Sequence, residues 1–230
     1  MSLTDQEIAA LLLSLKVSTV ATIVALPLAV AVAWLLARRT FAGKALVSAL
    51  VHLPLVLPPV VTGYMLLLVF GRRGVLGAIL EQSLGVILAF RWTGAALAAG
   101  IMGFPLMVRA IRLAFEAVDP KLEQAAATLG AGRIKVFVLV TLPLIAPGVL
   151  AGAVLGFAKA LGEFGATITF VANIPGETQT LPSAIYAFLQ VPGGEAAAIR
   201  LVGLAVFVAL GAVLISDWLG RRVAARIAGR

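Results

Sequence analysis

The chain has 230 residues, of which 62% are hydrophobic and only 12% are charged, and its mean hydropathy is +1.11. A water-soluble domain of this length does not carry so little polar surface. The excess of apolar side chains must face lipid, so we expect an all-α integral membrane protein. The sequence has no cysteine, which excludes disulfides and thiolate metal sites. The net charge of +8 comes from basic residues placed at the ends of apolar stretches, and this pattern is typical of membrane orientation rather than of nucleic-acid binding.

Five stretches are long and apolar enough to cross a bilayer, which takes about 20 residues of helix. They are residues 10–36, 46–70, 93–113, 139–163 and 199–219. Between and around them, residues 71–92 read as an outer amphipathic or re-entrant piece. Residues 172–197, rich in proline and glycine, read as an outer loop with a short helix over 181–190. These two segments either receive a soluble partner or merely connect the spans.

Basic residues predict which ends of the spans face the cytoplasm. Three regions hold 12 of the 18 lysines and arginines: the first connection, the loop between spans three and four, and the C-terminal tail. The positive-inside rule places these regions in the cytoplasm and the N-terminus outside. Five spans satisfy that assignment, in a multi-pass membrane protein.

The loop over residues 116–137 contains a short predicted helix. Asp119 is a good N-cap, and Pro120 suits the first helical position. Strong helix formers follow from Leu122 to Leu129, and Gly130 suits a left-handed stop. The three consecutive alanines after Gln124 give the helix a thin face that fits a groove on a partner. An ordinary capped loop helix is the alternative.

The same loop carries a spaced motif. Gln124, Ala125 and Ala126 are followed after three residues by Gly130, and after nine more by Val140, with Leu142 and Pro143 closing the pattern. This resembles the "EAA" loop of permease subunits of ABC importers, in which a cytoplasmic coupling helix docks into an ATPase. The resemblance implies a type I ABC importer permease fold of about five transmembrane helices over residues 1–230. One departure is that Gln124 stands at the glutamate position, while the neighbouring Glu123 points about 100° away around a helix.

The resemblance also implies which residues couple the permease to its ATPase. We expect these to be Leu122, Glu123, Gln124, Ala125, Ala126, Leu129 and Gly130. It further implies a homodimer of this subunit, two cytoplasmic ATPase subunits that bind ATP and magnesium, and an extracytoplasmic molybdate-binding protein. The resemblance places this assembly in a bacterial or archaeal plasma (inner) membrane. The chain itself has no G-x-x-x-x-G-K-[ST] motif, and we expect it to bind no cofactor and to be no enzyme.

Span two contains three prolines in its middle, Pro54, Pro58 and Pro59, followed closely by Thr62 and Gly63. Prolines interrupt helical hydrogen bonding, and lipid tolerates such a break only where protein or a water-filled path satisfies the backbone. Pro58, Pro59, Thr62 and Gly63 are therefore candidates for the transport pathway. A structural kink without substrate contact is the alternative.

Span four ends with two charged residues, Lys159 and Glu163, four positions apart. Charges in apolar segments are costly, and this spacing lets the two side chains pair on one helix face. The pair either braces an outer gate or lies at the membrane interface with its charges directed to water. Glu163→Gln is expected to impair transport without abolishing assembly.

Several further runs resemble the permeases of molybdate ABC importers. They are the proline-rich run around Pro58 and Pro59, the segments beginning at Phe104, Glu116 and Gly162, and the segment from Asn173 to Tyr186. This implies an importer subunit for molybdate that works by alternating access, with sulfate, thiosulfate or tungstate as alternative cargoes. An intramembrane enzyme is disfavoured because His52 is the only histidine and no nucleophile motif accompanies it. An ion-coupled carrier or channel is disfavoured because the coupling-type loop has no purpose there.

Overall fold

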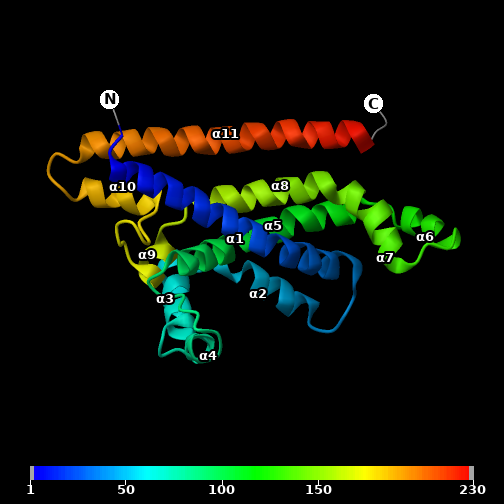
Figure 1. The fold of residues 1–230 in the computed structure, drawn as a ribbon. Helices are drawn as coiled ribbons and strands as arrows, with labels where there is room; N and C mark the ends of the chain where they lie inside the picture. The colour runs from blue at the N-terminus through cyan, green and yellow to red at the C-terminus, as the bar shows by residue number, and fades with distance from the viewer. Residues whose placement is uncertain (1–2, 228–230) are drawn as a thin grey trace.

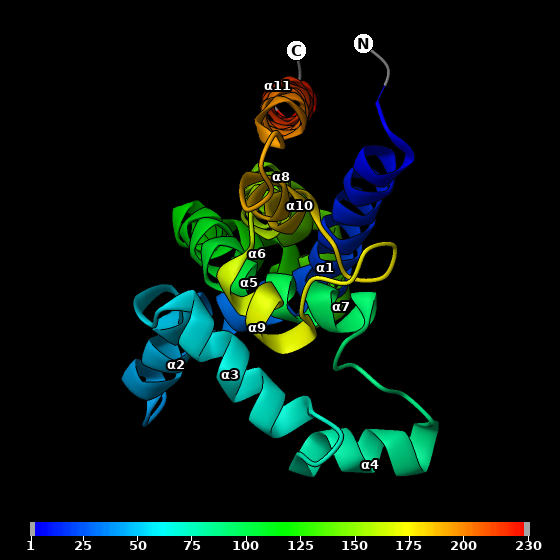
Figure 2. The same cartoon turned by 90° about the vertical axis from the view of Figure 1, so that its left-hand side faces the viewer.

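The computed structural model describes residues 3–227, and within them every regular element is a helix. The elements are α1 (Asp5–Arg38), α2 (Lys44–Val56), α3 (Pro59–Phe70), α4 (Val75–Leu84), α5 (Trp92–Ala117), α6 (Pro120–Thr128), α7 (Arg133–Val136), the π-helix η1 (Phe137–Thr141), α8 (Leu142–Leu161), α9 (Gly165–Val171), α10 (Leu181–Leu189) and α11 (Glu195–Ile227). Figure 1 shows α1, α5, α8 and α11 running along one another. In the view of Figure 2, α11 lies on one side of this bundle, and α2, α3 and α4 lie on the opposite side.

The centre of the bundle is α5, which packs against both α1 and α8. Its first turns present Ala95, Ala98 and Ala99, all fully buried, and its later turns bury Met107 and Phe115. Small side chains let helices approach closely in lipid, where apolar burial by itself does not drive association. Many large apolar side chains elsewhere are exposed instead, as expected for surfaces that contact lipid or other subunits.

Four of the described helical stretches are long and apolar enough to span a membrane, or up to five if the bent pair α2–α3 forms one span. The stretches expected at 10–36 and 93–113 lie inside α1 and α5. The stretch expected at 199–219 lies inside the longer α11. The side chains of its last turns fall largely outside the described residues.

The fourth span begins earlier than the sequence suggested. It was expected over residues 139–163, yet the helical path starts at Arg133 and passes through α7 and the π turn η1 into α8. The π turn is closed by the N–H of Leu142 on the carbonyl of Phe137, one residue further back than in an α-helix. Pro143 has no N–H to donate, so it can follow this wide turn without interrupting the helix.

The second span is broken, and the break falls at the prolines. The axes of α2 and α3 differ by 113°. Leu57 and Pro58 have extended backbone angles between the two helices. The ring of a proline disfavours helical geometry in the residue before it, which accounts for Leu57. As Figures 1 and 2 show, α3 leaves the bundle at this point and leads to α4.

The start of α3 packs against α9. A Cβ atom built on Gly63 would lie 2.5 Å from the carbonyl oxygen of Ala166 and 2.9 Å from the Cβ of Thr169. Only a glycine fits at this crossing. Residues 71–92 hold the short apolar helix α4, and the loop over residues 172–197 holds α10, close to the expected 181–190.

Polar contacts join the ends of α1, α10 and α11. Glu7 of α1 is fully buried, and its Oε1 accepts hydrogen bonds from Nε (3.0 Å) and Nη2 (2.7 Å) of Arg200 in α11. Ser14 Oγ accepts a 2.6 Å hydrogen bond from the backbone N–H of Leu181, at the start of α10. The first three turns of α1 are therefore held against both later helices, α11 through Glu7 and α10 through Ser14.

Arg200→Gln removes the cation that pairs with the buried Glu7 carboxylate. We expect it to lower the free energy of unfolding by about 3 kcal/mol, the lower end for a broken buried pair, because part of the arginine is reached by solvent. Arg112→Gln is the matched control, since its partner Glu116 is exposed and the expected loss is under about 0.5 kcal/mol. Thermal unfolding in detergent measures both, and equal midpoints for the two variants would contradict the prediction.

Gly63→Ala places a methyl group against the backbone of α9. The crossing must open, and we expect a loss of about 1–3 kcal/mol in the free energy of unfolding, as for other overpacked contacts. Gly203→Ala in α11 meets open space and is the control, with an unchanged or slightly higher unfolding midpoint. An unchanged midpoint for Gly63→Ala would show that the crossing is loose.

Candidate coupling loop and pathway residues

The predicted loop helix is present as α6, and its ends follow the expected chemistry. Asp119 Oδ1 accepts a 2.9 Å hydrogen bond from the N–H of Lys121, and Pro120 occupies the first turn. The helix ends at Thr128, so Leu129 is its C-cap rather than its last residue. Gly130 follows with a φ of +87°, a left-handed conformation that glycine adopts at no steric cost.

The loop exposes large apolar side chains at one end of the molecule. Leu122 is 49% exposed, Leu129 is 89% exposed and Ile134 is 81% exposed. Figure 1 shows α6 and α7 at the end where α1 finishes, beyond the long helices. Apolar side chains gathered outside a lipid-facing bundle mark a surface for another protein. Ile134 was not among the residues predicted from sequence, and its signal was an isoleucine between Arg133 and Lys135 in a polar loop.

The two polar residues of the predicted coupling set face in different directions. Gln124 is exposed, whereas Glu123 is partly buried. Glu123 Oε1 lies 3.2 Å from Nη2 of Arg38 and accepts a 2.9 Å hydrogen bond from Oγ1 of Thr141. The carboxylate is thus used inside the subunit, between the end of α1 and the π turn.

The predicted pathway residues come together where α3 meets α9. Pro58 lies in the break between α2 and α3, and a Cβ built on Gly165 would lie 2.7 Å from the ring of Pro59. Thr62 is buried on the same turn as Gly63, and its Oγ1 has no hydrogen-bond partner among the described residues. The broken helix is therefore packed on α9 and is not free to swing independently.

Lys159 and Glu163 form the predicted ion pair directly before α9. Lys159 Nζ lies 2.6 Å from Glu163 Oε2, and the Glu163 side chain is 1% exposed against 30% for Lys159. Glu163 Oε1 also accepts a 3.0 Å hydrogen bond from the N–H of Ala166. The carboxylate therefore holds both the end of α8 and the first turn of α9, on which α3 rests.

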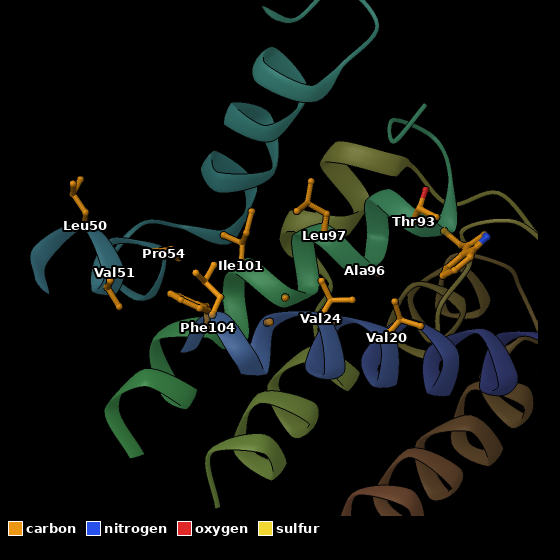
Figure 3. Close-up of a pocket in the computed structure, with 15 residues that line it drawn as sticks. Val20, Val24, Leu50, Val51, Pro54, Thr93, Ala96, Leu97, Ile101 and Phe104 are labelled. Carbon is orange, nitrogen blue, oxygen red and sulfur yellow. The ribbon is translucent and has the colours of Figure 1, made fainter. Parts of the chain in front are cut away.

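A cavity of about 600 Å³ lies between α1, α2 and α5. Figure 3 shows the side chains that point into it, among them Val24 of α1, Pro54 of α2 and Phe104 of α5. None of the predicted pathway residues lines it, and its lining is almost entirely apolar. Such a surface offers no group to retain an anion. The described residues also contain no cluster of three or more His, Cys, Asp or Glu side chains suited to a metal ion.

Comparison with solved structures identifies the fold. The crystal structure of a bacterial ABC transporter involved in the import of the acidic polysaccharide alginate has a chain that matches with a TM-score of 0.74 at 20% identity, over 95% of this chain and 80% of that one. The inward-facing MetNI methionine ABC transporter matches with a TM-score of 0.69 at 16% identity, over 94% of each chain. The fold is that of a type I ABC importer permease, as the loop motif implied.

Comparison of sequences identifies the family. A family model described as "Binding-protein-dependent transport system inner membrane component" matches residues 20–229. The molybdenum transport system permease protein ModB of Escherichia coli (strain K12) is 60% identical over 221 residues, which make up 96% of each chain. The ModB protein of Haemophilus influenzae is 56% identical over 94% of this chain and 95% of that protein. The chain therefore belongs to the family of binding-protein-dependent transport system inner membrane components, and it falls among the ModB permeases of that family.

Proposed function

We propose that this chain is the transmembrane permease subunit of an ATP-driven importer for molybdate. The observation that carries the proposal is the 60% identity to the molybdenum transport permease of Escherichia coli over 96% of both chains. Over such a length the match includes the loop helix, the broken span and the segments around Glu163. The chain itself performs no ATP hydrolysis in this proposal, and ATP and magnesium belong to a separate ATPase subunit.

The proposed assembly contains two copies of this subunit, two cytoplasmic ATPase subunits and an extracytoplasmic molybdate-binding protein. Two copies are needed because the four or five spans of one chain are too few to enclose a path for a tetrahedral oxyanion. The apolar surface of Leu122, Leu129 and Ile134 supports docking of an ATPase at the end that carries α6. Burial of such side chains at the centre of an interface is the usual source of binding energy.

The proposed orientation in the inner membrane places α6 in the cytoplasm. It is supported by the basic residues near that end, which include Arg38, Arg39, Arg133 and Lys135. The start of α1 and the helix α10 then lie outside, where a binding protein delivers its anion. The N-terminus is outside and the C-terminus is cytoplasmic in this arrangement.

Transport follows alternating access in this proposal. ATP-driven closure of the two ATPases moves the α6 helices, and the long helices rearrange from inward-open to outward-open. The contact of Pro59 and Gly63 with α9, held by the Lys159–Glu163 pair, is suited to an outer gate because α3 and α9 must move together. The lysine charge is balanced by the glutamate, so the gate does not retain a divalent anion on its way through.

The proposal is tested by ATP hydrolysis and uptake in proteoliposomes that hold this chain and its ATPase. Binding protein loaded with molybdate, tungstate or sulfate is added in turn. We expect molybdate to stimulate hydrolysis and to be taken up. A preference for sulfate or thiosulfate, or for tungstate, would replace the proposed cargo. Absence of any bound ATPase would contradict the importer assignment itself.

Glu163→Gln keeps the size of the side chain but removes the charge that pairs with Lys159. We expect molybdate uptake to fall about tenfold, the size of effect that follows from the loss of one charge-assisted hydrogen bond. Co-purification of the ATPase should stay near wild type, because Gln can still accept from the N–H of Ala166. The unfolding midpoint should fall less than in Arg200→Gln, because the charge that remains, on Lys159, is partly exposed. Glu177→Gln is the control, since Glu177 and Arg91 form a long, exposed pair of 4.0 Å. Uptake unchanged by Glu163→Gln would remove the gate role.

A further inference from the structure

Helix α6 has almost no apolar packing of its own onto the membrane helices. None of its residues is buried, and only Glu123 and Ala126 are partly covered. A helix in this position must nevertheless pass on any force that is applied to it. Contacts other than a hydrophobic core must therefore join it firmly to the long helices.

The Glu123 carboxylate supplies these contacts. Its Oε1 accepts from Thr141 Oγ1 at 2.9 Å and lies 3.2 Å from Nη2 of Arg38, while the same Arg38 atom donates to the carbonyl of Val118 at 3.2 Å. Within residues 3–227, the other side-chain hydrogen bonds of α6 and its cap stay inside the loop. Glu123 Oε1 thus joins α6 to the end of α1 and to the π turn before α8, and Arg38 extends this junction to the C-cap of α5.

The surroundings of this junction favour a strong contact. Thr141 is 2% exposed, and the Arg38 and Glu123 side chains are 16% and 27% exposed. Charge pairs from which water is partly excluded interact more strongly than pairs in open solvent. The Arg112–Glu116 pair of α5 is of the opposite kind, because both side chains are more exposed and lie on a single helix.

We propose that Glu123 is a positioning residue that transmits movement of α6 to α1 and α8 through Arg38 and Thr141. This inference rests on the proposed function and deepens it. The inference assigns two roles, ATPase binding and transmission of movement, to different residues of the loop. The exposed side chains of α6 and α7 receive the ATPase, while Glu123 faces the opposite way and carries the displacement into the membrane helices. The π turn ends at Thr141, so α8 is held at the residue directly before its start.

The test compares Glu123→Gln and Thr141→Val with the control Glu116→Gln. Each variant is reconstituted with its ATPase and molybdate-loaded binding protein, and molybdate transported per ATP hydrolysed is measured. We expect both junction variants to lower this ratio about fivefold or more, the lower end of usual coupling effects. The basal ATPase rate and ATPase co-purification should change little in Thr141→Val, because the Thr141 side chain is buried inside the subunit. The double variant should lower the ratio further than either single variant, because Glu123→Gln weakens the contact with Arg38 whereas Thr141→Val removes the hydrogen bond from the hydroxyl.

A second measurement does not depend on the cargo. The chain has no native cysteine, so Tyr64→Cys on the exposed face of α3 can be labelled alone. We expect ATP to change the rate at which this cysteine reacts with a thiol reagent when residue 123 is glutamate. In the protein that also carries Glu123→Gln, we expect ATP to leave this rate unchanged.

Two outcomes would overturn the inference. The first is an unchanged transport ratio, together with the same ATP response of Cys labelling in both proteins. The second is loss of the ATPase from the Glu123→Gln complex, which would make Glu123 a docking residue. Failure of the wild-type protein to transport molybdate, with its ATP response of labelling intact, would count against the cargo and not against this junction.

Discussion

In a bilayer, every backbone N–H and C=O must find its hydrogen-bond partner within the protein, and the remaining structure depends on this constraint. It makes long helices the default and allows a break only where other protein surrounds it. The break at Pro58 and Pro59 meets that condition, because the start of α3 is seated on α9 with Gly63 at the crossing. The place where the chain is least regular is thus also a place of close packing.

Charged side chains in this protein are few, and those described with a partner lie at the ends of helices. Glu7 with Arg200 and Lys159 with Glu163 hold the end that carries α10, and Glu123 with Arg38 holds the end that carries α6. Glu7 with Arg200 and Glu123 with Arg38 each join two helices, and Glu163, paired with Lys159 of α8, also accepts from the N–H of Ala166 in α9. The exposed Arg112–Glu116 pair lies within one helix. The long helices between the two ends are joined mainly by small apolar residues of α5. Such contacts allow helices to shift with little loss of hydrogen bonding, while the polar pairs hold neighbouring helix ends together so that they move as one.

This division suits a permease whose energy source is a separate subunit. The loop that carries α6 has an exposed apolar surface for that subunit and a single carboxylate that faces back into the bundle. The apolar cavity between α1, α2 and α5 has no charged side chain in its lining and therefore offers no group that would retain an anion.

The amino-acid sequence by itself determined the class of protein, the approximate spans, the α6 helix with its Asp119 cap and Gly130 stop, the break at the prolines, and the pairing of Lys159 with Glu163. These features depend on composition or on residues within a few positions of one another, where helix geometry decides what meets. Only the tertiary structure decided that Glu123 turns toward Arg38, 85 positions away, that Gly63 meets Ala166, and that the fourth span starts at Arg133 through a π turn. Neighbouring residues such as Glu123 and Gln124 point in different directions around a helix. Which of them meets a partner depends on how helices that are distant in the sequence pack together.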